Sequence, residues 1–284
     1  MGGEIETRPH PTRVALIGEA DVAGTASGRL LLLASLARLG VEGTFVDDDG
    51  LDSSSPHACA LLLLFRASHI SQARQLQAST QVPLCIPAAD ILALEDKQLF
   101  RSWCTARGFG PWLPSLSSGG VYPAVAKWGT SRGCSGVRLL QSERDLERCP
   151  DDGSCVIEEY IQGDGEFAFH FVAWKGRIVA HATCRYQFCS SLYCKGSVDG
   201  AMDCTATSVP LPEGADQLFR AVVLTMGYSG WGDIDFKLDL RGDVRMLELN
   251  PRVGLGLLYQ ESMAADFIRL LAAYVEVSMR KPAG

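Results

Sequence analysis

The sequence predicts an α/β domain at the N-terminus followed by a larger α+β region. Short apolar strands alternate with helical segments as far as residue 86, a pattern typical of a parallel sheet covered by helices. Farther along, two long strands meet at residues 174–177, and a second strand pair turns at residues 241–243. A chain of 284 residues is long enough to form one large domain or two to three small ones.

The N-terminal segments can each be assigned to a strand or a helix. The apolar sequence RVALIG at residues 13–18 predicts a strand ending in glycine, and a helical pattern from Ser27 to Leu39 is ended by Gly40. The other predicted elements are strands at Val41–Val46, Ala58–Phe65 and Val82–Ile86 and a helix at His69–Ala78. We expect this domain to end near Ala89.

The middle of the chain combines a helix with a glycine-rich loop. Residues 90–109 predict one helix that carries Lys97, with Leu92, Leu99, Phe100 and Trp103 on its apolar side. A strand then ends at Lys127, and residues 129–136 are rich in Gly, Ser and Thr. Such a loop can direct backbone N–H groups and hydroxyls onto a phosphate, with the lysine as a point charge. A glycine-rich hairpin without a ligand is the alternative.

Residues 154–226 predict mainly strands. A strand closes in Glu158 and Glu159, and two long strands follow, the first opened by Glu166. Residues 189–207 lack a clear period and predict a long loop. Two helices are predicted, one from Asp216 to Met226 and a C-terminal amphipathic one within residues 261–279.

Residues 230–254 predict a β-hairpin with oxygen ligands on one face. Polar residues alternate with Ile234, Phe236 and Leu238, and a turn centred on residues 241–242 pairs Asp235 with Glu248 and Asp233 with Asn250. Carboxylates held roughly 5 Å apart repel each other unless a cation lies between them. Carboxylate and amide oxygens suit Mg²⁺, or Mn²⁺, which also binds substrate phosphates. A solvated acidic strand face is the alternative.

Composition limits the classes of partner. The net charge is −7, which argues against nucleic acid as the main partner. No apolar run reaches the length of a membrane span, so we expect no membrane partner. Ten cysteines without an export signal predict reduced thiols and a cytoplasmic location.

Five motifs occur in an informative order: EDKQLF, PAVAKWGTSRGCSG, VIEEYIQGDGEF, GDIDFKLD and ELNPR. Over roughly residues 91–276, this order resembles the ATP-grasp superfamily, in which two α+β subdomains close on Mg·ATP. D-alanine–D-alanine ligase and domains like those of carbamoyl phosphate synthetase are members. The resemblance implies a pre-ATP-grasp βα domain at 1–89, a lid subdomain with the glycine-rich loop at 90–160, and a subdomain with the metal-binding hairpin at 161–284.

The resemblance also implies roles for individual residues. Lys97 and Lys127 match lysines that contact ATP phosphates, and Arg252 matches an arginine that faces the carboxylate and the acyl phosphate, so Lys127 and Arg252 are candidate catalytic residues. Further candidate nucleotide contacts are Ser131, Ser135, Glu158, Glu159, Tyr160, Ile161 and Glu166. Asp235, Glu248 and Asn250 match the metal ligands, in agreement with the hairpin pairing.

The implied function is an ATP- and Mg²⁺-dependent ligase. It would activate a small-molecule, amino-acid or peptide carboxylate as an acyl phosphate for attack by an amine. Two alternatives are open: phosphoryl or carboxyl transfer without amide formation, and a nucleotide-binding protein without turnover. The lysine pair and the Asp/Glu/Asn set argue against the second. The apolar helix at Ser27–Leu39 and the relatives of this fold lead us to expect a homodimer.

Overall fold

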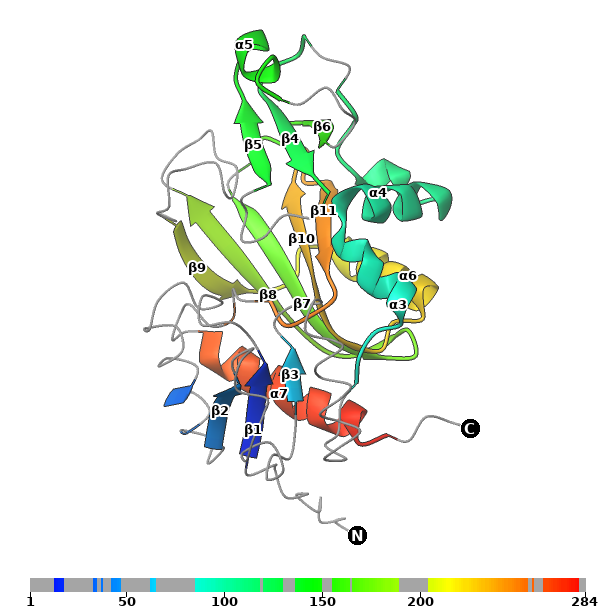
Figure 1. Ribbon diagram of the computed structural model, residues 1–284, viewed down its shortest axis with the longest axis vertical. Coiled ribbons are helices and arrows are strands. Elements are labelled where there is room, and N and C mark those ends of the chain that lie inside the picture. Colours follow the sequence, from blue (N-terminus) through cyan, green and yellow to red (C-terminus); the bar gives the residue numbers. More distant parts are fainter. Residues whose placement is uncertain are drawn as a thin grey trace.

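A five-stranded antiparallel sheet forms the centre of the molecule (Figure 1). Its order is β11-β10-β7-β8-β9, from the strands β7 (Glu166–Trp174), β8 (Arg177–Phe188), β9 (Cys204–Val209), β10 (Gly230–Leu238) and β11 (Val244–Asn250). The computed structural model describes residues 13–17, 33–34, 37, 42–46, 62–64, 85–117, 120–129, 136–149, 155–163, 165–188, 204–254, 257 and 263–280. The structure is mixed α/β with antiparallel sheets after the N-terminal strands, in agreement with the α+β region that the sequence predicts.

Strand β9 corrects the predicted loop at 189–207. Residues 204–207 belong to this strand, which pairs with β8 from Phe188↔Cys204 to Thr183↔Val209. The sequence CTATSV has only small and β-branched residues, so its apolar signal is weak. Its strand conformation depends on the backbone pairing with β8. Residues 189–203 lie outside the described part of the chain.

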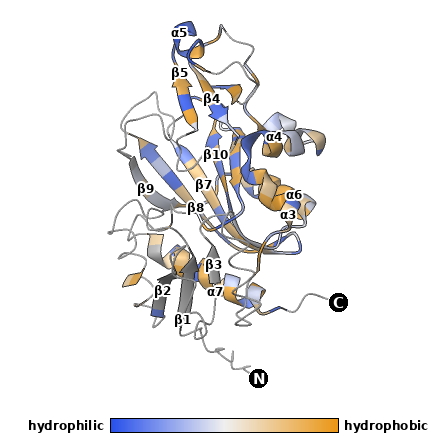
Figure 2. Cartoon of the chain, viewed as in Figure 1, coloured by the Kyte–Doolittle hydropathy of each residue, from blue (hydrophilic) through white to orange (hydrophobic). Residues whose placement is uncertain are grey.

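Helices cover the two faces of the central sheet. On one face, α6 (Ala215–Met226) packs through Phe219 and Val222 onto a cluster that includes Phe169, Phe171 and Phe236. On the other face, α7 (Ala264–Ser278) packs around Trp231 through the side chains of Phe267, Leu270 and Tyr274. In Figure 2, most of the ribbon of α6 has the colour of hydrophobic residues. Both predicted helices are confirmed, and Gly227 ends α6 in the left-handed conformation at φ 62°.

A second sheet of three strands, in the order β5-β4-β6, lies at the end of the molecule opposite the N-terminal strands (Figure 1). Its strands are β4 (Ala124–Trp128), β5 (Val137–Leu140) and β6 (Cys155–Glu159), and all pairings are antiparallel. Helix α5 (Glu143–Leu146) follows β5. Between β4 and β5, only residues 129 and 136 of the glycine-rich loop are described.

The N-terminal strands β1 (Arg13–Ile17), β2 (Glu42–Val46) and β3 (Leu62–Leu64) form a parallel sheet in the order β2-β1-β3. Three predicted strands are therefore confirmed. Of the predicted helix at 27–39, residues 33, 34 and 37 are described and are helical, and the predicted helix at 69–78 lies outside the described residues. Of the predicted strand at 82–86, Cys85 and Ile86 are described and neither is in a strand. The complete βα domain stays a prediction.

The predicted single helix at 90–109 is wrong. The structure has α3 (Ala89–Leu92), a 3₁₀ turn η4 (Ala93–Glu95), α4 (Lys97–Ala106) and a second 3₁₀ turn, η5 (Gly110–Trp112). The break is at Asp96, which is extended (φ −70°, ψ 121°) and whose Oδ1 accepts hydrogen bonds from the backbone N–H groups of Gln98 and Leu99 at 2.9 and 3.0 Å. An aspartate that caps a new helix start competes with continued helix. Leu99, predicted on the apolar side, is 50% exposed.

Replacing Asp96 with alanine is expected to lower the free energy of unfolding by about 1 kcal/mol, because two N–H groups of α4 lose their acceptor. Asp96→Asn is the matched control, since asparagine also accepts hydrogen bonds at this position. Urea unfolding of both variants measures the difference. Equal stability of Asp96→Ala and the wild type would show that the cap does not stabilise α4.

Among the described residues, no helix is long and apolar enough to cross a membrane. The cysteines Cys85, Cys104, Cys149, Cys155 and Cys184 are free thiols. Burial raises the pKa of the Cys104 thiol to about 12, which keeps it protonated and unreactive at neutral pH.

Candidate active site

The predicted pairing of the hairpin is confirmed. Asp235 lies opposite Glu248, and Asp233 lies opposite Asn250. Cross-strand partners share one face of a sheet, so these four polar side chains are on the same side. The alternative of a solvated acidic face is wrong, because the exposed fraction is 4% for Asp233 and 2% for Asp235. On the opposite face, Ile234 and Phe236 are buried, as predicted, and they pack in the core with residues of α6.

A β-bulge in β11 makes this pairing possible. Next to the turn, Leu238 pairs with Val244 and Phe236 with Met246; the register then shifts, and Asp235 pairs with Glu248. Leu247 is thus the extra residue. Without the shift, Asp235 would lie opposite Leu247, and Glu248 would point to the other face. The bulge therefore brings the two carboxylates together.

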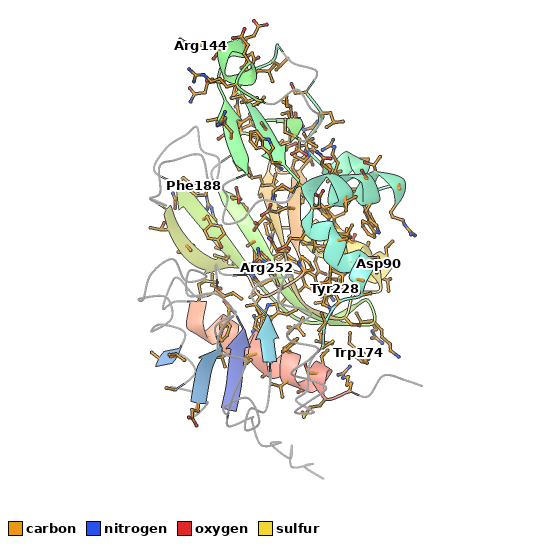
Figure 3. The ribbon with its side chains drawn as sticks, in the orientation of Figure 1. Asp90, Arg144, Trp174, Phe188, Tyr228 and Arg252 are labelled. Carbon is orange, nitrogen blue, oxygen red and sulfur yellow. The ribbon has the colours of Figure 1, made fainter. Side chains whose placement is uncertain are left out.

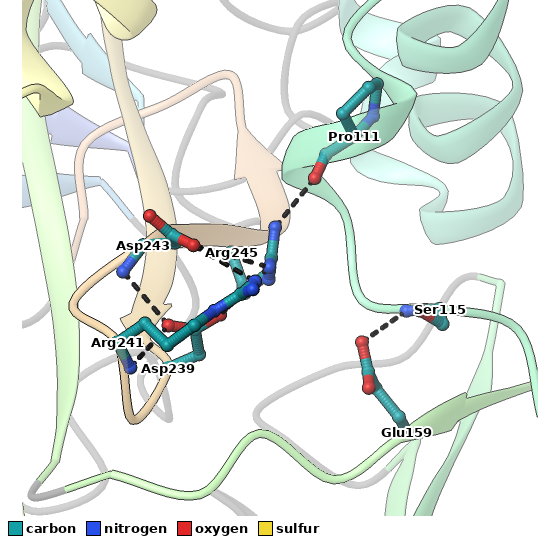
Figure 4. Close-up of polar contacts among 7 residues, drawn as sticks. All are labelled: Pro111, Ser115, Glu159, Asp239, Arg241, Asp243 and Arg245. Atoms are coloured by element: carbon teal, nitrogen blue, oxygen red, sulfur yellow. Dashed lines mark hydrogen bonds and ion pairs between the residues drawn. The ribbon is translucent and has the colours of Figure 1, made fainter.

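The turn that sets the first register is held by Asp239. Its Oδ1 accepts hydrogen bonds from the N–H groups of Arg241 and Asp243 at 2.9 and 3.0 Å (Figure 4). Its Oδ2 lies 2.8 Å from Nη2 of Arg245, and Nη1 of the same guanidinium donates to the carbonyl of Pro111 at 2.7 Å. These contacts fix the hairpin tip against the segment that follows α4.

Two lysines from different elements meet at residues 247 and 248 of β11. Lys97, the first residue of α4, places Nζ 3.0 Å from Oε2 of Glu248. Lys127, on β4 of the small sheet, donates from Nζ to the carbonyl of Leu247 at 3.2 Å. Both predicted lysines therefore lie beside the candidate metal ligands, although they are 30 positions apart in the sequence.

Glu158 forms a buried charge cluster with Lys127. Its Oε2 lies 2.7 Å from Nζ of Lys127, and its Oε1 lies 2.7 Å from Nη1 of Arg101 on α4. Lys127 and Glu158 face each other because β4 and β6 are paired strands of the same small sheet, with Lys127 beside Val156. A buried cation and a buried carboxylate are stable when they are paired in this way.

Arg252 lies at the centre of the molecule (Figure 3) and is fixed by three contacts. Its Nε donates to Oε1 of Glu95 at 3.0 Å, its Nη2 to Oδ1 of Asn250 at 2.9 Å, and its Nη1 to the carbonyl of Val253 at 3.4 Å. Burial by itself lowers the pKa of Arg252, but the carboxylates of Asp233, Glu95 and Glu248 more than offset it, so the net pKa is raised. The guanidinium is therefore a permanent positive charge beside the candidate ligand Asn250.

The remaining predicted nucleotide contacts are placed as follows. Glu159 points away from Glu158, as consecutive strand residues do, and accepts a hydrogen bond from the N–H of Ser115 at 2.7 Å (Figure 4). Tyr160, Ile161 and Glu166 are buried where β6 leads into β7. Ser131 and Ser135 lie outside the described residues.

Three charged residues of the site are missing from the sequence predictions. Glu95 holds Arg252, Arg101 holds Glu158, and Lys237 donates from Nζ to the carbonyl of Ile161 at 3.3 Å. Glu95 and Arg101 have no local signal, since a charge on a helix is usually solvated. Lys237 has one: it shares the polar side of the alternating pattern with Asp233 and Asp235.

The donor set fits Mg²⁺. Asp235, Glu248 and Asn250 offer carboxylate and amide oxygens from one strand pair, and Nδ2 of Asn250 donates to Oε1 of Glu248 at 3.4 Å. The ammonium of Lys97 already pairs with Glu248 as a metal cation would. Among the described residues, no three His, Cys, Asp or Glu side chains are placed so that they could hold a metal ion by themselves. The candidate set differs from such a group, because it consists of two carboxylates and one amide. Two carboxylates and one amide are typical of a Mg²⁺ site that substrate phosphates complete.

Comparison with known proteins supports the fold. No family model and no curated protein sequence matches the chain. Biotin carboxylase from Campylobacter jejuni aligns with a TM-score of 0.62 and 16% identity, over 96% of this chain and 72% of that chain. D-alanine–D-alanine ligase from Bacillus anthracis aligns with a TM-score of 0.60 and 16% identity, over 95% of this chain and 98% of that chain. L-amino acid ligase from Bacillus licheniformis aligns with a TM-score of 0.59 and 14% identity, over 96% and 78%.

These three proteins share one architecture. This chain has the ATP-grasp fold. The resemblance found in the sequence motifs is therefore confirmed at the level of structure. The central sheet carries the hairpin with Asp235 and Glu248, and the small sheet β5-β4-β6 carries Lys127.

Proposed function

We propose that this protein is an ATP- and Mg²⁺-dependent ligase that joins a small carboxylate to an amine. One observation carries the proposal: Lys97 and Lys127 meet at residues 247 and 248, beside the oxygen set of Asp235, Glu248 and Asn250. Two cations next to carboxylates suited to a metal form an environment for a triphosphate. Neither a solvated hairpin nor a purely structural ion pair explains why lysines from two separate elements, α4 and β4, meet at one bulge.

The first step is phosphoryl transfer from ATP to the carboxylate. A carboxylate oxygen bonds to the γ-phosphorus, the bond between that phosphorus and the β–γ bridging oxygen breaks, and ADP leaves with the electron pair. Lys97 and Lys127 would turn from Glu248 and Glu158 toward the phosphates and offset their charge. Mg²⁺, or Mn²⁺, held by Asp235, Glu248 and Asn250, would supply further charge neutralisation.

The second step forms the amide. The amine nitrogen bonds to the carbonyl carbon of the acyl phosphate, the C–O bond to phosphate breaks, inorganic phosphate leaves, and the nitrogen loses a proton to solvent. Arg252 would hold the carboxylate and then the acyl phosphate, because a planar guanidinium matches both groups. Its contacts with Glu95 and Asn250 keep it next to the proposed metal ligands.

The nucleotide base would lie at the hinge formed by Glu158, Tyr160 and Ile161, with Glu166 at the ribose and the loop hydroxyls of Ser131 and Ser135 at the phosphates. Two contacts support placing the base at this hinge. Glu158 forms an ion pair with Lys127, and the carbonyl of Ile161 accepts a hydrogen bond from Lys237 on β10. Glu159 contacts Ser115 on the other side of the strand, so we assign it a supporting role in positioning this segment. We further propose that the protein acts in the cytoplasm as a homodimer.

The test is ADP release from the purified protein and Mg·ATP, measured against amino acids and small carboxylic acids, singly and in pairs. We expect one acid to raise ADP release and a paired amine to raise it further, with a product whose mass shows the loss of water between acid and amine. ADP release without amide formation would favour phosphoryl or carboxyl transfer. ATP binding with no turnover in any pool would favour a binding protein.

A further inference from the structure

Lys237 is a buried lysine that the proposed chemistry does not use. Its exposed fraction is 5%, and it follows Asp235 by two residues on the same face of β10. Successive same-face residues on a strand are about 6.6–6.8 Å apart, so Lys237 lies one step from the proposed metal site, toward the hinge. A methionine could fill similar space without the desolvation penalty of a charge, so a buried lysine here calls for a polar role.

The hinge surrounds the Lys237 ammonium with defined partners. Nζ donates to the carbonyl of Ile161 at 3.3 Å and lies 4.7 Å from the centre of the Tyr160 ring. The next segment is held tightly against β10, because a Cβ at Gly163 would lie 2.5 Å from the carbonyl oxygen of Leu238. An acceptor and a cationic donor are therefore fixed about one hydrogen-bond length apart.

We propose that Lys237 is the specificity-determining residue for the nucleobase and selects adenine. On one edge, adenine presents the N6 amino donor beside the N7 acceptor, whereas guanine presents two acceptors, O6 and N7. The carbonyl of Ile161 would accept from N6 and the ammonium of Lys237 would donate to N7. An ammonium carries three N–H donors, so the bond to Ile161 is compatible with a bond to the base.

Guanine is disfavoured by the same arrangement. Its O6 would face the carbonyl oxygen of Ile161, and two acceptors repel each other. Lys237 lies two residues from the proposed metal ligand Asp235 on β10, so this one strand would contact the base and, through the metal, the phosphates. This inference rests on the proposed function, since it requires that a nucleotide binds at the hinge.

The experiment compares three nucleotides in the full-length protein. Dissociation constants for Mg·ATP, Mg·7-deaza-ATP and Mg·GTP are measured by titration calorimetry for the wild type and for Lys237→Met. 7-deaza-ATP keeps the amino group but has a C–H in place of N7. We expect the wild type to bind ATP about tenfold or more tightly than 7-deaza-ATP, and to bind GTP more weakly than ATP. In Lys237→Met, ATP affinity should fall by about the same factor, and the two adenine nucleotides should bind equally.

Controls separate folding from recognition. Lys237→Arg keeps a cationic donor and should retain the preference for ATP over 7-deaza-ATP. Arg177→Met removes an exposed cation on β8 and should leave all three affinities unchanged. If Lys237→Met keeps the wild-type ratio of ATP to 7-deaza-ATP affinity, or if the wild type itself shows no such preference, the assignment of Lys237 is overturned while nucleotide binding stands. If the wild type binds none of the three, the proposed function itself fails.

Discussion

Replacing Glu248 with glutamine is expected to lower turnover by about a thousandfold or more while the protein stays folded. The Glu248 carboxylate is the proposed ligand that faces Asp235 across the strand pair. A glutamine amide at this position would bind Mg²⁺ without the negative charge of the carboxylate. Losing a single preorganised group at a reacting centre costs about 10²–10³ in kcat, and a metal ligand should matter at least as much. ADP release with saturating Mg·ATP measures the effect.

The stability of Glu248→Gln should change little. Glu248 pairs with Lys97 at 3.0 Å, and a glutamine oxygen can still accept a hydrogen bond from that ammonium. We expect a loss of about 0.5–1.5 kcal/mol, read from thermal or urea unfolding. A second readout does not depend on turnover: stabilisation by ATP should increase with Mg²⁺ in the wild type and become nearly insensitive to it in the variant.

The matched control is Glu213→Gln, which alters an exposed glutamate before α6. It should match the wild type in ADP release and in the Mg²⁺ dependence of stabilisation. Wild-type turnover in Glu248→Gln would remove Glu248 from the metal site. Equal losses in both glutamine variants would point to a general effect of charge on the protein.

The hairpin pairing could be predicted from sequence because two independent constraints agree there. The alternation from Asp233 to Lys237 fixes which side chains share a face, and the acidic partners need a common cation. The predicted register assumes a turn centred between residues 241 and 242. In the structure, the pairs next to the turn, such as Leu238 with Val244, are centred on Arg241 instead. The bulge at Leu247 supplies the missing shift. Nothing in the letters VRMLELN marks that bulge, because Leu247 resembles any strand residue.

The parts that could not be predicted depend on contacts between distant segments. Glu95 and Arg252 are 157 positions apart, and Arg101 and Glu158 are 57 apart, so neither pair leaves a local pattern. Each of these charges is consistent with a solvated helix or strand end until the fold places its partner. The break at Asp96 is different: an aspartate before an amphipathic helix is a capping signal, but it lies inside a longer helical pattern that outweighs it.

Arg252 gives the second prediction with a large effect. In Arg252→Lys, kcat should fall by about a hundredfold or more, while the dissociation constant for Mg·ATP should stay within about threefold. A lysine keeps the charge but loses the planar fork, which here makes three separate contacts, to Glu95, Asn250 and the carbonyl of Val253. One ammonium cannot reproduce that arrangement and also present a flat pair of donors to an acyl phosphate.

Arg245→Lys is the matched control, because Arg245 is also a largely buried arginine with several contacts, but it holds the hairpin turn through Asp239 and Pro111. It should lower the melting temperature without a comparable loss of kcat. Single-turnover measurement of ADP formation, together with ATP binding, separates the two effects. Wild-type kcat in Arg252→Lys would exclude Arg252 from the acyl-phosphate site. A loss confined to ATP affinity would instead place its guanidinium on the nucleotide, where its contact with Asn250 would make it part of the metal and phosphate site.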